Sequence, residues 1–216
     1  IRFGGAVAQS TVLGGADADS ISLNAGGSQI SVEGQLGNDT LHLNSTFSQA
    51  TITGGDDNDY ITAGGTYVQS SVFGGSGNDT LLINATVTSS SAFIAGAGND
   101  SIAIAITGGS VFGGASFGDT AAGNDTLNIN GVVSGSALID AGDGTNLITA
   151  SASISGSSVY SGSGNDTFST GADVYGGRIA TGAGNDQLTF GTNVTAATTI
   201  NAGAGNDTLT FAGLVS

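Results

Sequence analysis

Aspartates that return in a fixed context are the residues of this sequence best suited to chemistry. A Gly-Asn-Asp tripeptide, or a close variant of it, recurs every 20 to 25 residues. Its acidic members are Asp19, Asp39, Asp59, Asp79, Asp100, Asp125, Asp166, Asp186 and Asp207. Asn146 fills the remaining slot of the series. Glycine lets backbone carbonyls approach an ion and Asp supplies charged oxygen, so the pattern predicts binding of a hard cation.

Electrostatics favours the same interpretation. Stacked turns would place these carboxylates about 4.8 Å apart along one edge, where like charges repel. Divalent ions between the turns would convert that repulsion into cross-links, and oxygen ligands select Ca²⁺ over zinc or copper. About eight Ca²⁺ ions would supply roughly +16, which nearly cancels the formal net charge of −15. Asp17 and Asp57 occupy the fourth position of their turns and are expected to add ligands, and Asn146, which keeps the oxygen without the charge, is also a candidate ligand.

Short strands must position these turns, because apolar residues keep the same phase as the aspartates. Residues assigned to the column two places after the slot are Ile21, Leu41, Ile61, Leu81, Ile102, Leu127, Leu147, Phe168, Leu188 and Leu209. Further apolar columns lie four and eight residues after the slot and just before the next Gly-rich turn. Each coil therefore offers about four inward side chains.

A single 20-residue coil cannot bury its apolar face, so we expect the coils to stack. We predict an all-β fold: a right-handed parallel β-solenoid (β-roll or β-helix) of about ten 20-residue coils, with a calcium-binding turn column on one edge. Residues 1–216 are expected to form one domain, an excerpt or polymerising unit of a larger secreted assembly, because Ile1 to Phe3 correspond to the middle of a coil. Phe117 to Ala121 are expected to be an insertion beside a turn.

Composition excludes several classes of function. Two basic residues cannot form a nucleic-acid surface, and no apolar run has the ~18 residues of a membrane span. Without Cys there is no thiolate zinc site or disulfide, and a single His, His42, leaves little room for imidazole chemistry. We expect no enzyme, and Arg2, Arg178 and His42 are interpreted as surface residues.

The turn Gly74-Gly75-Ser76-Gly77-Asn78-Asp79 resembles the Gly-Gly-x-Gly-x-Asp nonapeptides of RTX (repeats-in-toxin) proteins. This resemblance implies a Ca²⁺-binding β-roll in which turn carbonyls and the sixth-position aspartates hold the ions. It also implies secretion in an unfolded state, with folding outside the cell. The opposite turns, such as Asn44-Ser45-Thr46, lack the motif, so the chain is more similar to the one-sided variants of S-layer proteins and repetitive adhesins.

We therefore expect a structural calcium-binding repeat protein of a bacterial cell surface: an S-layer, an extracellular filament or a giant adhesin. Folding and self-association, end to end or lateral, are expected to depend on calcium, and a cell-surface glycan is a further candidate partner. Two alternatives remain open: the RTX tail of a secreted toxin or hydrolase, and an ice-binding adhesin domain with an outward Ser/Thr ladder that includes Thr40, Thr80 and Thr167. Metal-free Asx turns would also explain the aspartates, and the Asn-Asp-Thr repeats also match the glycosylation sequon.

Overall fold

The structure, a computed structural model, describes residues 1–88, 91–107, 110–112, 123–195 and 197–216. Throughout these ranges the regular elements are β-strands. The expected insertion at Phe117 to Ala121 lies outside the described residues. In the described part of the chain, no helix has the length and apolar character needed to cross a membrane.

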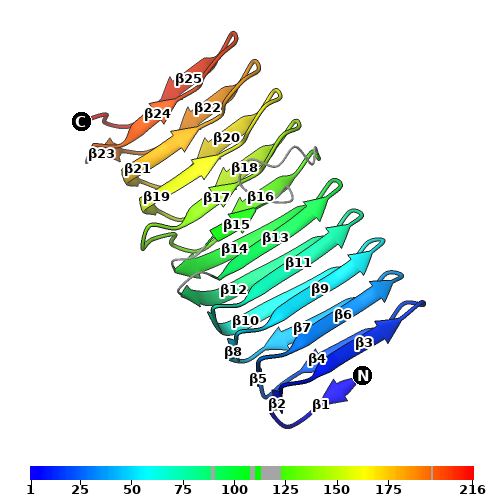
Figure 1. The fold of residues 1–216 in the computed structure, drawn as a ribbon. Helices are drawn as coiled ribbons and strands as arrows, with labels where there is room; N and C mark the ends of the chain where they lie inside the picture. The colour runs from blue at the N-terminus through cyan, green and yellow to red at the C-terminus, as the bar shows by residue number, and fades with distance from the viewer. Residues whose placement is uncertain (89–90, 108–109, 113–122, 196) are drawn as a thin grey trace.

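Two parallel sheets account for the strands of the described residues, and most coils supply strands to both (Figure 1). The larger sheet has fourteen strands: β1 (Arg2–Phe3), β2 (Val7–Ala8), β4 (Ser20–Leu23), β5 (Gly27–Ser28), β7 (Thr40–Asn44), β8 (Phe47–Ser48), β10 (Tyr60–Val68), β12 (Thr80–Thr88), β14 (Ser101–Thr107), β16 (Thr126–Ile129), β18 (Leu147–Ala150), β20 (Thr167–Thr170), β22 (Gln187–Phe190) and β25 (Thr208–Phe211). The smaller sheet has eleven: β3 (Thr11–Gly15), β6 (Ser31–Leu36), β9 (Thr51–Asp56), β11 (Ser71–Ser76), β13 (Ala92–Ala97), β15 (Ser110–Phe112), β17 (Leu138–Asp140), β19 (Ile154–Tyr160), β21 (Val174–Ala180), β23 (Val194–Thr195) and β24 (Thr199–Asn201).

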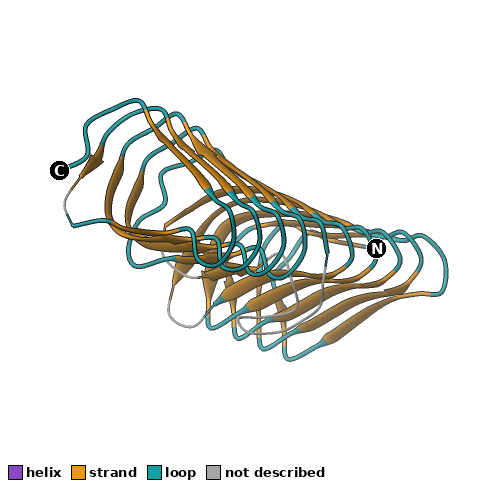
Figure 2. Cartoon of the chain, turned by 90° about the horizontal axis from the view of Figure 1, so that it is seen from above, coloured by secondary structure: helices purple, strands orange, loops and turns teal. Residues whose placement is uncertain are grey.

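Each strand pairs with its counterpart one coil away. Tyr60 of β10, for example, pairs with Thr40 of β7 on one side and with Thr80 of β12 on the other. The chain thus winds into a β-solenoid of about nine turns, and the expected all-β parallel solenoid is confirmed. Figure 2 shows the successive coils one behind another, with strands on the two broad faces and loops along the edges.

The interior is filled by ladders of identical or similar side chains, as the apolar phase predicts. In the column two residues after the slot, Ile61, Leu81, Ile102 and Leu127 lie in register and are 1% exposed or less. Phe47 and Tyr67 stack in another column of the larger sheet with ring centroids 5.3 Å apart, and Tyr67 makes an edge-on contact, at 4.9 Å, with Phe93 of the smaller sheet across the core. Such stacking lets each coil bury its apolar face against the next.

One assignment to the inward columns is wrong. Leu147 is 40% exposed, and Ile148, at 1%, pairs with Leu127 in the buried column. The reason is that Asn146 occupies the Asp slot, so the residue two places later is Ile148, while Leu147 follows the outward alternation of the strand. Ala150 is likewise buried, and Thr149 points outward to contact the Asn128 side chain.

In the last coil, the side chains of the inward columns are exposed to solvent. Leu209 is 42% exposed and Phe211 is 39% exposed, although both continue buried columns through Leu188 and Phe190. At the other end, Arg2 of β1 pairs with Ser22 of β4, so the chain enters the solenoid in the register expected for the middle of a coil.

Candidate metal centre

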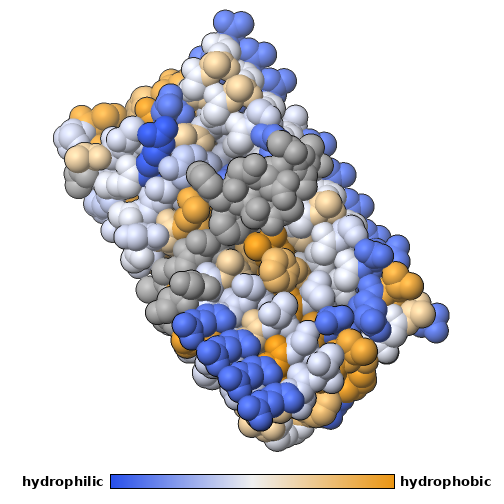
Figure 3. Space-filling view, in the orientation of Figure 1, coloured by the Kyte–Doolittle hydropathy of each residue, from blue (hydrophilic) through white to orange (hydrophobic). Residues whose placement is uncertain are grey.

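The Gly-rich turns lie along one edge of the solenoid, where the chain passes from the smaller sheet to the larger one (Figure 1). Each slot residue directly precedes a strand of the larger sheet, as Asp39 precedes β7 and Asp79 precedes β12. Figure 3 shows hydrophilic residues following one another along this edge. We call the nine aspartates of the repeat together with Asn146 the Asp column.

Glycine in these turns is required by close contact between coils. Gly98 has a φ of +131°, and a Cβ added there would lie 1.8 Å from the carbonyl oxygen of Gly77 in the preceding coil. A side chain is therefore excluded both by the backbone conformation and by the neighbouring carbonyl. This contact explains why the Gly recurs with the same phase as the Asp.

From Asp39 onward, the Oδ1 atom of each column residue accepts a hydrogen bond from the preceding coil. The backbone N–H of Asp59 donates to Oδ1 of Asp79 at 2.8 Å, and the N–H of Thr80 donates to the carbonyl of Asp59 at 2.8 Å. The N–H to Oδ1 bond repeats at every step from Asp19 to Asp207, with N–O distances of 2.7 to 3.0 Å. Backbone and side chain thus join each turn to its neighbours.

The second oxygen has no such partner. Among the described residues, seven column aspartates carry a buried Oδ2 that accepts no hydrogen bond: Asp39, Asp59, Asp79, Asp100, Asp125, Asp166 and Asp186. These side chains are only 1% to 3% exposed. A buried carboxylate oxygen without a donor is costly, so these positions call for a cation or a proton.

The pKa values of the column carboxyls are raised because burying their charge is unfavourable. Burial raises the pKa of Asp59 to about 7, and charge repulsion from Asp79 and Asp39 adds to the rise, although the hydrogen bond from Asp39 opposes it. Burial likewise raises the pKa of Asp79, Asp100 and Asp166 to about 7 and that of Asp125 to about 6. The metal-free edge is therefore an unfavourable place for negative charge.

Carbonyl oxygens converge on the same space as the unpaired Oδ2 atoms. A Cβ added to Gly34 would lie 2.0 Å from Oδ2 of Asp39 and 2.3 Å from the carbonyl oxygen of Gly54 in the next coil. For Gly74 the corresponding distances are 2.3 Å to Oδ2 of Asp79 and 2.4 Å to the carbonyl of the next coil. Glycine therefore leaves open a cradle that is lined by oxygen atoms.

Asn146 reveals what this cradle accommodates. Its Oδ1 accepts the N–H of Asp125, as a column Asp would. Its Nδ2, in place of the second carboxylate oxygen, donates to the carbonyls of Gly142, Gly144 and Ser161 at 2.9, 3.4 and 3.0 Å. Three carbonyls thus face one point, which the uncharged amide donor of Asn146 occupies in this turn.

The donor set fits a hard cation. Carboxylate and carbonyl oxygens are the ligands that Ca²⁺ takes in proteins. Within the ranges that the structure describes, there is no group of three or more His, Cys, Asp or Glu side chains able to hold a metal. Backbone carbonyls would therefore have to contribute the larger share of each ligand set, with the column Asp supplying the charge.

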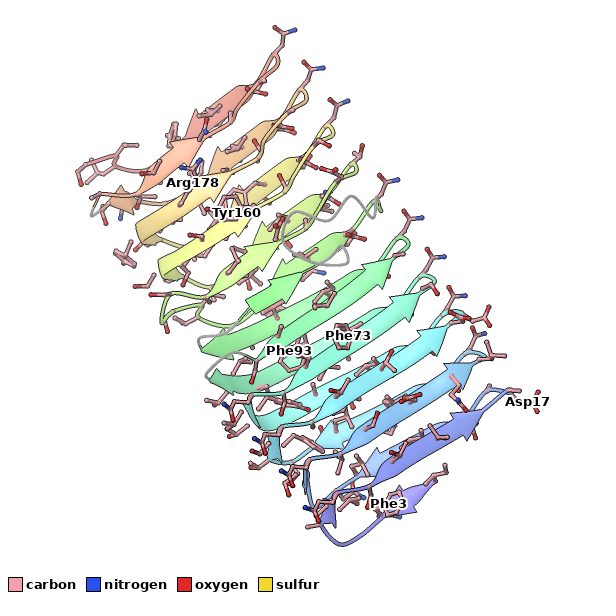
Figure 4. The ribbon with its side chains drawn as sticks, viewed as in Figure 1. Phe3, Asp17, Phe73, Phe93, Tyr160 and Arg178 are labelled. Atoms are coloured by element: carbon pink, nitrogen blue, oxygen red, sulfur yellow. The ribbon has the colours of Figure 1, made fainter. Side chains whose placement is uncertain are left out.

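The other predicted ligands are placed differently. Asp17 and Asp57 are exposed, and Asp17 lies at the outer tip of its turn (Figure 4). Oδ2 of Asp57 accepts the N–H of Gly37 at 3.2 Å, a contact between coils on the solvent side. In the end coils of the column, Asp19 and Asp207 are more accessible than the interior aspartates.

The asparagines that precede the column form a second ladder, which was not predicted from the sequence. The N–H of Asn78 donates to Oδ1 of Asn58 at 2.6 Å, and the N–H of Asn99 donates to Oδ1 of Asn78 at 2.8 Å. These bonds run in the opposite direction to those of the Asp column. An Asn precedes eight of the nine column aspartates, with Ala18 before Asp19, and this recurrence was the available signal.

The residues interpreted as surface groups make local contacts. Nδ1 of His42 lies 2.9 Å from Oγ1 of Thr62 on the outward face of the larger sheet. The Arg178 guanidinium lies over the ring of Tyr160, 5.9 Å from its centroid (Figure 4).

The outward column of the larger sheet is in register, but Ser and Thr occupy only part of its length. Ser169, Thr189 and Thr210 pair in succession. Nearer the middle of the sheet, Leu82 and Ala103 pair with each other in the same outward column and interrupt the ladder.

Comparison with known proteins identifies the repeat. Four segments, residues 51–66, 71–82, 157–174 and 196–212, match the family profile of the RTX calcium-binding nonapeptide repeat. They contain the turns of Asp59, Asp79, Asp166 and Asp207. Searches of curated proteins and of solved structures gave no significant match.

Proposed function

Because this chain is an RTX calcium-binding β-roll, we propose that its function is structural and that its folding is coupled to calcium bound along the Asp column. The observation that carries this proposal is the row of buried Oδ2 atoms without donors, each beside converging carbonyls. RTX β-solenoids are in general structural, non-catalytic folds.

Each part of a turn has a distinct role in the proposed site. Oδ1 of Asp79 holds the backbone of the preceding coil, which fixes the carboxylate and leaves Oδ2 directed at the cradle. Gly74 keeps the cradle open, and the carbonyl of Ala95 contributes an oxygen from the next coil. A bound Ca²⁺ would supply the positive charge that the cradle lacks. Since its ligands come from successive coils, the folded stack would bind the ion and the unfolded chain would not.

Far-ultraviolet circular dichroism during a Ca²⁺ titration tests this coupling. In calcium-free buffer at pH 8 we expect a reduced strand signal and a low melting temperature. Both should rise as Ca²⁺ is added, and Mg²⁺ should be a poor substitute because it demands a tighter octahedral site. Equal strand signals and melting temperatures with and without Ca²⁺ would overturn the proposal.

Asp79→Asn and Asp56→Asn form a matched pair for the same titration, because each removes one negative charge from the turn edge. Asp79 is 1% exposed and belongs to the column, whereas Asp56 is exposed and accepts a hydrogen bond from the Ser76 hydroxyl. D79N should lower the number of bound ions by one, and D56N should leave it unchanged. Equal effects of the two substitutions would indicate diffuse charge screening in place of a site.

We further propose that the protein acts outside the cell, as part of a bacterial surface layer, a filament or a giant adhesin. RTX repeat proteins are typically secreted, which supports an extracellular location. Calcium is scarce in the cytosol, so the chain would stay unfolded there and fold after export. Expression in the cytoplasm should therefore give a chain that is sensitive to protease until Ca²⁺ is added to the lysate. Protease resistance before that addition would contradict export in the unfolded state.

Self-association is proposed to occur by stacking of one coil on another, end to end. Successive coils join through parallel strand pairing and the N–H to Oδ1 bonds of the Asp column, and the same pairing would join the coils of two copies. Sedimentation velocity in Ca²⁺ should show species that grow with concentration, and Leu214→Asp should shift them toward the monomer. Monomers at all concentrations would contradict this proposal.

A further inference from the structure

Asn146 distinguishes one turn from all others in the described column. We propose that this turn binds no calcium, because the Asn146 amide permanently fills the position that an ion takes elsewhere, and that it divides the metal column into two separate arrays. The inference rests on the proposed calcium function and concerns where along the column the ions bind.

Oδ1 of Asn146 accepts a hydrogen bond as Oδ1 of a column carboxylate does. Its Nδ2 is a hydrogen-bond donor at the place where a carboxylate has a second acceptor oxygen. Oδ1 accepts the N–H of Asp125 at 2.8 Å, within the range found at the other steps of the column. Nδ2 then donates to two carbonyls of its own turn and to one of the next coil. An amide group already surrounded by three carbonyls leaves those oxygens satisfied, and its own positive polarity repels a cation.

The Asn ladder also changes at this turn. Oδ1 of Asn124 accepts the N–H of Thr145, but Thr145 has no amide side chain with which to continue the ladder toward Asn165. Asp143 holds the next coil instead, since its Oδ1 accepts both the N–H and the hydroxyl of Ser163. The turn is thus joined to its neighbour by protein donors.

Hydroxyl donors extend this pattern into the two following coils. Ser161 donates its hydroxyl to the carbonyl of Thr181 at 3.3 Å, and Thr181 donates to the carbonyl of Ala202 at 2.9 Å. These carbonyls correspond to the carbonyl of Ser161 that receives the Asn146 amide. On the other side of the break, Gly14, Gly34, Gly54, Gly74 and Ala95 stand at this position and carry no side-chain donor, while Thr120, at this position of the Asp125 turn, lies outside the described residues.

Two arrays with different character follow from this arrangement. The first runs from Asp19 to Asp125 and has open glycine cradles over much of its length. The second runs from Asp166 to Asp207, and part of its carbonyl set is already bonded to hydroxyls. The first array should bind its ions more tightly, and the coils around Asn146 should be the part of the solenoid that depends least on calcium.

Counting bound ions in Asn146→Asp tests the proposal. Native mass spectrometry of the full chain at saturating Ca²⁺ should show one ion more in N146D than in the unmodified protein. The melting temperature in calcium-free buffer should fall, because the carboxylate cannot donate to the three carbonyls. Asp79→Asn is the reciprocal control and should lose one ion.

The outcomes separate this inference from the proposed function. If the unmodified chain binds no Ca²⁺, the proposed function fails. If it binds Ca²⁺ and N146D binds the same number of ions, only the inference fails. Should N146D not fold at saturating Ca²⁺, the unmodified protein decides the question by anomalous diffraction from calcium-loaded crystals. An ion between the turns of Asn146 and Asp166 overturns the inference, and ions on both sides with that interval empty support it.

Discussion

Single glycines in the turn edge are placed where no other residue fits. Gly98 combines a positive φ with a carbonyl oxygen 1.8 Å from where a Cβ would lie, whereas an added Cβ at Gly171 would have no heavy atom within 4 Å. We expect Gly98→Ala to lower the free energy of unfolding by about 2 kcal/mol or more, since backbone strain alone costs on the order of 1–3 kcal/mol. Gly171→Ala should change it by roughly 0.5 kcal/mol or less. Urea denaturation at saturating Ca²⁺ compares the two.

The raised pKa values of the column carboxyls predict an unusual pH dependence for the metal-free protein. Asp59, Asp79, Asp100 and Asp166 have pKa values of about 7 in the folded chain, above the ordinary value of 3.8. Between pH values near 3.8 and 7 the folded state binds more protons than the unfolded state. The free energy of unfolding of the metal-free protein therefore falls as pH rises. The stabilising contribution is fully present below about pH 4 and is lost as pH passes through about 7.

Thermal melts in calcium-depleted buffers from pH 4 to pH 8 measure this effect. The melting temperature should decrease with pH, and the decrease should be weaker at saturating Ca²⁺, because the ion then neutralises the same carboxylates. A melting temperature that rises with pH in the absence of Ca²⁺ would show that the buried carboxyls are stabilised by groups other than protons.

At the scale of the strand, the phase of the inward columns determines which residues matter for stability. Ile148 is buried in β18 beside Leu127, and its neighbour Leu147 is 40% exposed. Ile148→Ala should lower the free energy of unfolding by about 2–5 kcal/mol, as truncations in packed cores do. Leu147→Ala should cost less than about 1 kcal/mol. Denaturation at saturating Ca²⁺ measures both, and equal losses would contradict the register.

These strands show how far the sequence could be interpreted. The period of the aspartates and the apolar columns were sufficient to predict a parallel solenoid, because a one-residue shift would turn every inward side chain outward. The column was misassigned at Leu147, where the Asp slot holds Asn. Counting two places from the slot residue Asn146 gives Ile148, and pairing with the preceding coil shows the same register.

The sequence was sufficient to predict which residues form the candidate site. It was not sufficient to predict what each side-chain oxygen of those residues contacts. The spacing placed nine aspartates along one edge, but it could not show that Oδ1 holds the neighbouring coil while Oδ2 lacks a donor. It also could not show that Asp57 contacts Gly37 on the solvent side, or that the Asn146 amide reaches three carbonyls. Those contacts depend on the packing of each turn against the turn of the neighbouring coil.

At the scale of the whole molecule, the charge pattern distinguishes binding from screening. The chain carries a formal net charge of −15, and most of its acidic residues lie along the turn edge. Sodium chloride at 1 M shortens the Debye length to about 3 Å and weakens repulsion between exposed carboxylates. It cannot satisfy buried oxygens that require a fixed ligand geometry.

We therefore expect 1 M NaCl in calcium-free buffer to restore only a small part of the strand signal that millimolar Ca²⁺ restores. Circular dichroism of the same sample under the two conditions provides the comparison, with MgCl₂ at equal ionic strength as control. Full recovery in NaCl alone would mean that long-range repulsion, and not the buried Oδ2 atoms, keeps the metal-free chain from folding.

The N–H to Oδ1 hydrogen bonds of the Asp column all point the same way along the stack. The N–H of Asp39 donates forward to Asp59, and the carboxylate of Asp39 receives the N–H of Asp19 from behind. A coil arriving on the C-terminal side brings an acceptor to a waiting donor, and one arriving on the N-terminal side brings a donor to a waiting acceptor. Within the Asp column, a stack of coils therefore presents carboxylate acceptors toward one end and backbone N–H donors toward the other.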